Sequence, residues 1–132
     1  MILVGKKTAD MITMRIAKEV ADIEDKITLS IFLVGQDPAS IVYVNKKLKA
    51  CDDAGILVDS HFLNDNITQK ELIKLVEDCN KNPDIHGILV QMPLPSHIDA
   101  DVILNTIDPN KDVDGLTIIN QGKLLAGEET IV

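Results

Sequence analysis

Three short apolar runs, separated by stretches with helical periodicity, constrain the fold of this chain more than any other feature. The runs lie at residues 28–34, 56–63 and 87–90. The first is almost continuously apolar, as expected of a strand that is covered on both faces. Alternation of strands and helices predicts βαβ units with right-handed crossovers. We therefore expect an α/β fold, namely a three-layer α/β/α domain with a mostly parallel sheet.

The stretches between the runs carry start and stop signals of helices. Residues 8–26 show helical periodicity ahead of the first run. Asp37 suits an N-cap, Pro38 suits the first helical position after it, and Gly55 is a typical C-terminal stop. The sequence Thr68–Glu71 is a capping box that opens a further helix. These signals predict helices at about 8–26, 38–54 and 69–79.

The C-terminal third has weaker patterns. A short helix is predicted at residues 98–104, after the prolines that follow the third run. From Asp108 onward the sequence predicts a loop, with a small hairpin at Gly122–Gly127. No internal repeat or linker interrupts the 132 residues, so we expect one domain.

Charge and cysteine usage exclude several classes of protein. The net charge of −8 argues against non-specific nucleic-acid binding. No apolar run approaches the ~18 residues of a membrane-spanning helix, and the N-terminus lacks the features of a signal peptide. Cys51 and Cys79 match no metal or redox spacing. We expect a cytoplasmic protein with two free, reduced thiols, no bound metal, and no nucleic-acid or membrane partner.

Parallel sheets bind ligands at the carboxyl ends of their strands, which directs attention to the residues that follow each run. Tyr43 and Lys47 follow the first run and are four residues apart, so they share one face of the predicted helix. Tyr43 is the only tyrosine in the chain. A ring and an ammonium group at this place could contact a ligand, although a helical lysine is by itself usually a solvated surface group.

Gln91 ends the third run and is followed by a loop with two prolines. Pro93 and Pro95 lack an N–H group and cannot extend a ladder of strand hydrogen bonds, so the chain must leave the sheet here. Two interpretations of Gln91 stay open. Its amide either satisfies loop backbone, or it holds a ligand or a lysine in place.

The segment Asn110–Gly115 resembles a calcium loop through its acidic and amide positions and its glycine. Its twelfth position is Gln121, which cannot supply the bidentate carboxylate of such loops. A tight Asp-Gly turn without function is the stronger interpretation. Alternatively, Asp114 presents its carboxylate to the N–H groups of a heterocyclic ligand.

Other sequence motifs of catalysis or nucleotide binding are absent. Neither a dinucleotide fingerprint nor a P-loop occurs, and there is no nucleophile-elbow motif. His61, His86 and His97 do not cluster in the sequence, and ordinary hydrogen-bonded histidines are the default interpretation for all three.

Three stretches together resemble one family closely. They are VGQDPAS with YVNKKLKAC (residues 34–51), GILVQMPLP (87–95) and KDVDG (111–115). In this order they resemble the bifunctional methylenetetrahydrofolate dehydrogenase/methenyltetrahydrofolate cyclohydrolase family, and the resemblance covers essentially the whole chain. It implies that residues 1–132 are the N-terminal catalytic domain, and that the C-terminal NADP-binding Rossmann domain is absent from this chain.

The resemblance also assigns roles to site residues. It implies that Lys47 is the catalytic lysine, that Gln91 tunes and positions it, and that Tyr43 packs on the folate and belongs to the catalytic group. Asp114 is implied to bind the pterin. The remaining substrate-binding positions that it implies are Ser40, Val90, Pro93 and Leu94.

The family's activity sets the expected chemistry and partners. It comprises NADP-dependent oxidation of 5,10-methylenetetrahydrofolate to 5,10-methenyltetrahydrofolate, and hydrolysis of that product to 10-formyltetrahydrofolate. The resemblance implies tetrahydrofolate as substrate, NADP bound mainly by the absent domain, a homodimeric full-length enzyme, and a role in one-carbon metabolism that supplies purine and amino-acid biosynthesis. The alternative is a short non-enzymatic paralogue that binds folate or mediates dimerisation.

Overall fold

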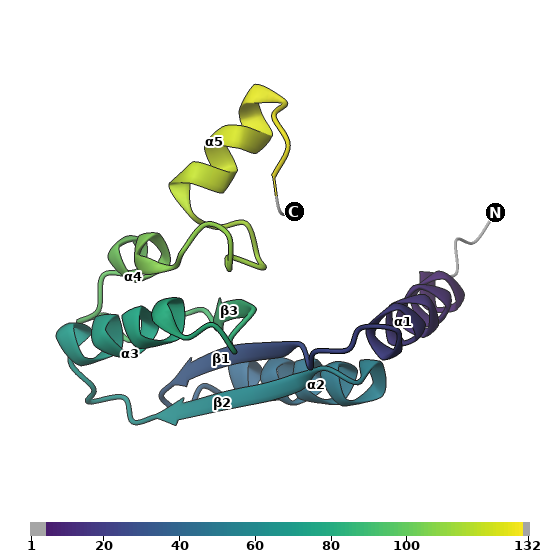
Figure 1. Ribbon diagram of the computed structural model, residues 1–132. Helices are drawn as coiled ribbons and strands as arrows, with labels where there is room; N and C mark the ends of the chain where they lie inside the picture. Colours follow the sequence, from purple (N-terminus) through teal and green to yellow (C-terminus); the bar gives the residue numbers. More distant parts are fainter. Residues whose placement is uncertain (1–4, 131–132) are drawn as a thin grey trace.

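The computed structural model describes residues 5–130 and contains a three-stranded parallel sheet (Figure 1). The strands are β1 (Thr28–Val34), β2 (Leu57–Leu63) and β3 (Gly87–Val90), arranged in the order β2-β1-β3. Both neighbours of β1 run parallel to it, which confirms the predicted α/β fold. The carboxyl ends of all three strands therefore meet at one edge of the sheet.

Helices cover both faces of the sheet and form the outer layers (Figure 1). The helix α2 lies on one face and α3 on the other, while α1 packs against α2 and α4 packs against α3. No helix in residues 5–130 is long and apolar enough to cross a membrane. The helices are α1 (Gly5–Ala21), α2 (Pro38–Ala54), α3 (Gln69–Lys81), α4 (Ala100–Thr106) and α5 (Ile118–Ala126).

The central strand β1 divides its side chains between two hydrophobic cores. Phe32 and Val34 point toward α3, where they join the larger cluster. Ile31 and Leu33 point toward α2 and pack with Val44. All four of these β1 side chains are buried, so the continuous apolar run reflects burial on both faces, as the sequence predicted.

Helix capping follows the sequence signals. Asp37 is the N-cap of α2, and its carboxylate accepts a hydrogen bond from the Ser40 backbone N–H at 2.7 Å. Gly55 ends this helix in the left-handed conformation, with a φ of 76°. Thr68 and Glu71 form both halves of the capping box at the start of α3. The predicted start of each of these two helices is thus confirmed.

The predicted boundaries are less accurate for other elements. The first helix begins at Gly5 and ends at Ala21, whereas the periodicity extended it to residue 26. The short helix α4 begins two residues later than predicted because Asp99 is its N-cap and accepts from the backbone N–H groups of Asp101 and Val102.

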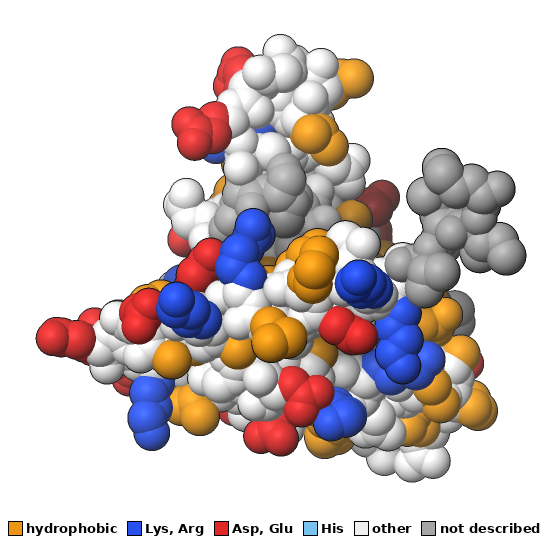
Figure 2. All heavy atoms as spheres, turned by 90° about the vertical axis from the view of Figure 1, so that its right-hand side faces the viewer, with side chains coloured by type: hydrophobic (Ala, Val, Ile, Leu, Met, Phe, Trp, Pro, Cys, Tyr) orange, Lys and Arg blue, Asp and Glu red, His pale blue; other side chains and the backbone are white. Residues whose placement is uncertain are grey.

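The predicted hairpin at Gly122–Gly127 is wrong, because this segment lies in the helix α5. Thr117 caps its start by accepting from the Asn120 backbone N–H, and Gly127 ends it with a φ of 71°. The cap and the terminal glycine were visible in the sequence, but Gly122 inside the segment obscured them. The helix projects away from the sheet, and Figure 2 shows apolar side chains on this projecting part. Four of its large apolar side chains are exposed, namely Ile118, Ile119, Leu124 and Leu125.

Candidate functional site

The structure brings Lys47 and Gln91 together at the carboxyl-end edge of the sheet. Lys47 Nζ donates a hydrogen bond to Gln91 Oε1 at 3.1 Å. Lys47 lies in the third turn of α2, and Gln91 is the first residue after β3. Both are half-buried, so the ammonium group is neither freely solvated nor enclosed. The two residues are 44 positions apart in the sequence, and their contact depends on the parallel arrangement of β1 and β3.

Backbone and side-chain contacts fix the orientation of the Gln91 amide. The Gln91 backbone N–H donates to the Phe32 carbonyl oxygen at 2.8 Å, which continues the pairing with β1 by one residue. Its side-chain Nε2 donates to the Met92 carbonyl oxygen at 2.7 Å. With the nitrogen occupied in this way, the amide oxygen is the atom that faces Lys47.

Ser40 connects the start of α2 to the same loop. Its side chain is buried, and its Oγ donates to the Met92 carbonyl oxygen at 3.3 Å. The loop continues through a cis peptide bond between Met92 and Pro93. Ser40, Lys47 and Gln91 are therefore linked through one carbonyl group and one amide.

Tyr43 lies one turn before Lys47 on α2, and its ring is uncovered. The residue is 57% exposed, and the ammonium group of Lys46 lies 5.8 Å from the ring centroid. No hydrogen bond within residues 5–130 joins Tyr43 to Lys47 or Gln91. The ring is thus available as an apolar surface beside the lysine.

Asp114 follows a segment that lies beside β3. A parallel bridge pairs Ile88 with Asp112, and Gly87 allows this close approach, because an added Cβ there would lie 2.6 Å from Val113 Cγ1. A chain that runs parallel to β3 carries Asp114 toward the carboxyl end of the sheet. Asp114 is exposed, and among residues 5–130 no hydrogen bond to its carboxylate is present.

The neighbouring carboxylate, Asp112, has a different role. It is 1% exposed and accepts hydrogen bonds from the backbone N–H groups of Leu116 and Thr117 and from Asn120 Nδ2. Burial alone would raise the pKa of Asp112, but these hydrogen bonds outweigh it and lower the pKa. Because both oxygens serve the turn into α5, this carboxylate does not point into a calcium loop.

The other implied substrate-binding residues are arranged unevenly. Pro93 is exposed in the loop after Gln91. Val90 is 3% exposed and belongs to the core on the α3 face, against which Leu94 also packs. A ligand at this edge can therefore reach the backbone at Val90, whereas its side chain faces the protein interior.

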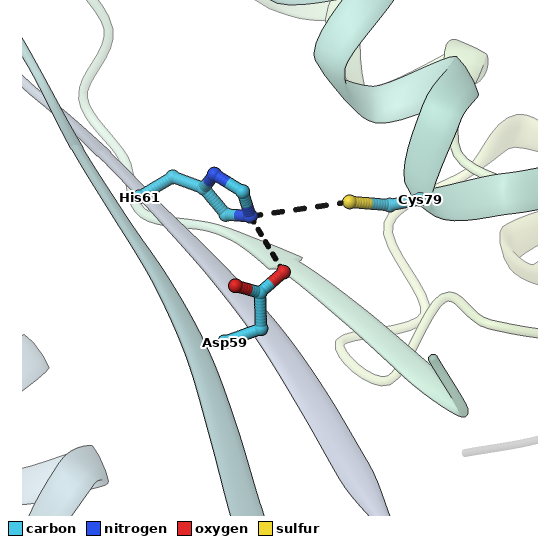
Figure 3. A group of neighbouring side chains, drawn as sticks. All are labelled: Asp59, His61 and Cys79. Carbon is cyan, nitrogen blue, oxygen red and sulfur yellow. Dashed lines mark hydrogen bonds and ion pairs between the residues drawn. The ribbon is translucent and has the colours of Figure 1, made fainter. Parts of the chain in front are cut away.

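A second polar group, on the α3 face, was missed by sequence reasoning. Asp59, His61 and Cys79 lie together there (Figure 3). Desolvation raises the pKa of the Cys79 thiol, and the charge of Asp59 adds to this effect. Asp59 and His61 are two residues apart on β2, which was the available signal, but Cys79 joins them only through packing. Both cysteines are free, as predicted.

Comparison with known proteins identifies the family. A family model described as the tetrahydrofolate dehydrogenase/cyclohydrolase catalytic domain matches residues 3–114. The bifunctional protein FolD of Chlamydia pneumoniae is 46% identical over 127 residues, which are 96% of this chain and 44% of that protein. FolD of Helicobacter acinonychis is 51% identical over 104 residues, which are 79% of this chain and 36% of that protein.

Solved structures agree in fold. The bifunctional FolD enzyme of Campylobacter jejuni superposes with a TM-score of 0.93 at 42% identity, over 95% of this chain and 45% of that one. The Trypanosoma brucei dehydrogenase-cyclohydrolase, solved with NADP cofactor and an inhibitor, gives a TM-score of 0.92 at 33% identity, over 98% of this chain and 46% of that one. The chain thus spans less than half the length of these relatives. Its sequence and fold place it in the tetrahydrofolate dehydrogenase/cyclohydrolase family.

Proposed function

We propose that this chain is the folate-binding, catalytic half of an enzyme that oxidises 5,10-methylenetetrahydrofolate and hydrolyses the 5,10-methenyl product to 10-formyltetrahydrofolate. The observation that carries the proposal is the hydrogen bond between Lys47 Nζ and Gln91 Oε1, at 3.1 Å. A neutral amide holds the ammonium group in position and does not neutralise it, as an acidic partner would.

In this proposal Lys47 transfers protons during hydrolysis. Water adds to the methenyl carbon and releases a proton to solvent. The Lys47 ammonium group then donates a proton to the ring nitrogen whose bond to that carbon breaks, and solvent returns a proton to the lysine. An ammonium group has three N–H donors, of which Gln91 accepts one. The other two N–H groups make no hydrogen bond within residues 5–130 and can donate to the substrate. Gln91, whose own amide is held by Met92, fixes the direction in which the lysine points.

The same proposal gives the exposed groups around the lysine a binding role. The uncovered ring of Tyr43 offers a face on which an aromatic part of folate can stack. The exposed carboxylate of Asp114 can accept hydrogen bonds from the adjacent N–H groups of a pterin. Ser40, Pro93 and the backbone from Val90 to Leu94 would contact the folate at this edge of the sheet.

The redox half-reaction requires parts beyond this chain's own site. We propose that NADP is the hydride acceptor and is bound mainly by the portion of the relatives that this chain does not match. From membership of the same family, we also propose that the complete enzyme is a homodimer and acts in cytoplasmic one-carbon metabolism.

The test replaces Lys47 by Ala in the complete enzyme, with Lys49→Ala as the control. Lys49 is exposed on the same helix and pairs with Asp53, so its loss removes a lysine without touching Gln91. Hydrolysis is followed by the loss of 5,10-methenyltetrahydrofolate absorbance, after subtraction of the uncatalysed rate. We expect Lys47→Ala to abolish hydrolysis and Lys49→Ala to retain it, while calorimetric titration with 5-formyltetrahydrofolate still detects binding to both.

Near-normal hydrolysis in Lys47→Ala would refute the assignment of Lys47 as the catalytic residue. Binding without hydrolysis in the unmodified protein would favour a non-enzymatic folate-binding module.

A further inference from the structure

Three side chains with different donor atoms converge on the face of the sheet that α3 covers (Figure 3). Asp59 and His61 project from the same face of β2, because they are two residues apart on a strand. Cys79 reaches them from the last turns of α3. His61 Nε2 lies 2.8 Å from Asp59 Oδ2 and 4.0 Å from Cys79 Sγ, and the three ligand atoms lie within 4.8 Å of one another.

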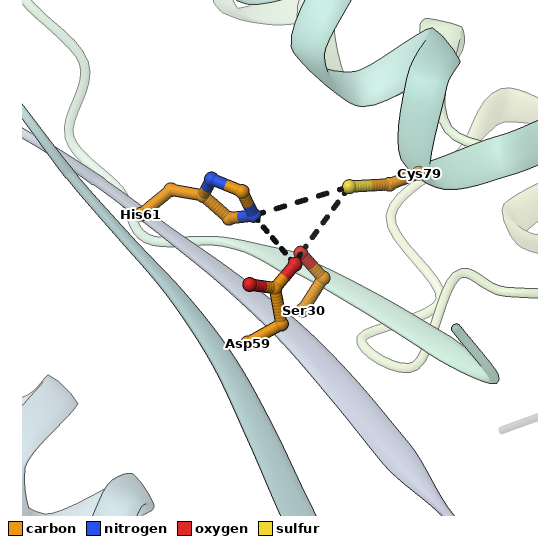
Figure 4. Close-up of polar contacts among 4 residues, drawn as sticks. All are labelled: Ser30, Asp59, His61 and Cys79. Atoms are coloured by element: carbon orange, nitrogen blue, oxygen red, sulfur yellow. Dashed lines mark hydrogen bonds and ion pairs between the residues drawn. The ribbon is translucent and has the colours of Figure 1, made fainter. Parts of the chain in front are cut away.

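Neighbouring residues hold this group in place. The His61 ring stacks on Phe32, with centroids 4.3 Å apart and an angle of 6° between the rings. Ser30 Oγ lies 3.4 Å from both Asp59 Oδ2 and Cys79 Sγ (Figure 4). Ser30 is fully buried, as is the Phe32 ring against which the histidine rests. The orientation of the imidazole is therefore set by packing before any ligand arrives.

The group is closed on one side and open on the other. Cys79 is 7% exposed, whereas the side chains of His61 and Asp59 are 24% and 44% exposed at the edge strand β2. An ion can enter from this edge, and a solvent molecule can remain there beside it. The buried sulfur supplies the soft ligand at the inner end.

We propose that Asp59, His61 and Cys79 form a binding site for a divalent cation of the zinc type. Carboxylate oxygen, imidazole nitrogen and thiolate sulfur are the three ligand types that zinc prefers. Zinc–ligand bonds of about 2.0–2.3 Å in a tetrahedral site place ligand atoms roughly 3.3–3.8 Å apart. The separations of 2.8 Å and 4.0 Å lie on either side of this range, and all three ligand atoms lie within 4.8 Å of one another, so binding requires side-chain movements that bring the three separations into the range.

Binding of the cation determines which of the three side chains carry a proton, and on which atom. The Cys79 thiol releases its proton to solvent and binds as thiolate. His61 binds through the Nε2 lone pair, so the neutral ring carries its proton on Nδ1. Asp59 Oδ2 then gives a lone pair to the cation. A water molecule takes the fourth position, on the side where His61 and Asp59 are exposed.

The bound cation would connect α3 to the edge of the sheet and stabilise the folded chain by mass action. The site lies on the opposite face of the sheet from α2, which carries Lys47, and is independent of the proposed enzymatic function. Its role is therefore structural, and cation binding should proceed without folate.

The test titrates the 132-residue chain with Co²⁺, whose thiolate charge-transfer and tetrahedral d–d absorption bands report its ligands, and then displaces it with Zn²⁺. Cys79→Ala removes the sulfur ligand, and Cys51→Ala is the matched control because it removes the other buried cysteine, which lies in α2. His61→Gln and the control His97→Gln form a second pair, since the one hydrogen bond of the His97 side chain within residues 5–130 is with the Ile67 carbonyl oxygen. Circular dichroism verifies that each variant folds.

We expect one Co²⁺ per chain, a charge-transfer band, displacement by Zn²⁺, and an increase in thermal stability with Zn²⁺. Loss of a ligand should weaken binding by roughly 100-fold or more, since even outer contacts of metal sites contribute 10–100-fold. The controls should bind as the unmodified chain does. Absence of the charge-transfer band in the unmodified chain, or equal binding by folded Cys79→Ala and His61→Gln variants, would overturn the proposal.

Discussion

The two faces of the sheet carry different kinds of polar group. On the α2 side, Lys47 and Gln91 meet at the carboxyl edge, where a neutral amide holds a half-buried ammonium group. On the α3 side, Asp59, His61 and Cys79 lie along the wall of the larger hydrophobic core. The first group faces the edge at which parallel sheets bind ligands. The second lies on a strand face and connects a helix to a strand. The proposed role of the first group is therefore chemical, and that of the second is structural.

Among the variants that compare the two faces of the sheet, Gln91→Leu should have the largest effect. Gln91→Leu removes the amide that positions Lys47 while keeping a side chain of similar volume. We expect hydrolysis in the complete enzyme to fall by about 100-fold, which corresponds to about 2.7 kcal/mol in the barrier. His61→Gln, on the other face, should leave the rate unchanged. Equal losses in both variants would mean that the two groups do not have separate roles.

The residues of the first group were identified as candidates from the sequence, whereas the second group was not. The motif around Gln91 and the spacing of Tyr43 and Lys47 were recognisable because each lies within one continuous segment. The group of Asp59, His61 and Cys79 was not recognisable in the sequence. Cys79 is 18 residues from His61 and approaches it only when α3 packs on the sheet. A different cause, a conflict between local signals, explains α5: Gly122 argued against a helix, whereas Thr117 and Gly127 provided good caps.

A matched pair of core substitutions compares the packing of the two faces. Val76 and Val44 are each 0% exposed, in α3 and α2 respectively. The cluster around Val76 contains eleven buried residues, whereas that around Val44 contains four, and partly buried side chains pack against both. We expect Val76→Ala to lower the free energy of unfolding by about 2–3 kcal/mol and Val44→Ala by about 1–2 kcal/mol, because a cavity at a thin face collapses more easily. Urea denaturation measures both, and a greater loss for Val44→Ala would reverse the ranking.

The capping box of α3 should contribute less than the core beneath it. Thr68→Ala removes the acceptor of the Glu71 backbone N–H and weakens the reciprocal contact of Glu71 with Thr68. We expect a loss of about 1 kcal/mol in the free energy of unfolding. Thr68→Ser retains the hydroxyl group and serves as the control. A full loss in Thr68→Ser would show that the methyl group, and not the cap, is responsible.

The smallest effect concerns acid stability beside the proposed folate site. The pKa of Asp112 is lowered by hydrogen bonds from Thr117, Asn120 and Leu116, which are opposed by its burial. A carboxyl group with a lowered pKa in the folded state stabilises the fold above its ordinary value of 3.8, and this contribution is lost as the pH falls through the lowered value. Because burial offsets much of the gain, we expect a shallow decline in stability below pH 3.8.

Denaturation at several acidic pH values, with Asp112→Asn for comparison, should show a smaller decline in the variant. Asp114, two residues away, is exposed and accepts no hydrogen bond from residues 5–130, and Asp114→Asn should weaken folate binding. An identical decline in Asp112→Asn and the unmodified chain would remove the distinction between the two aspartates.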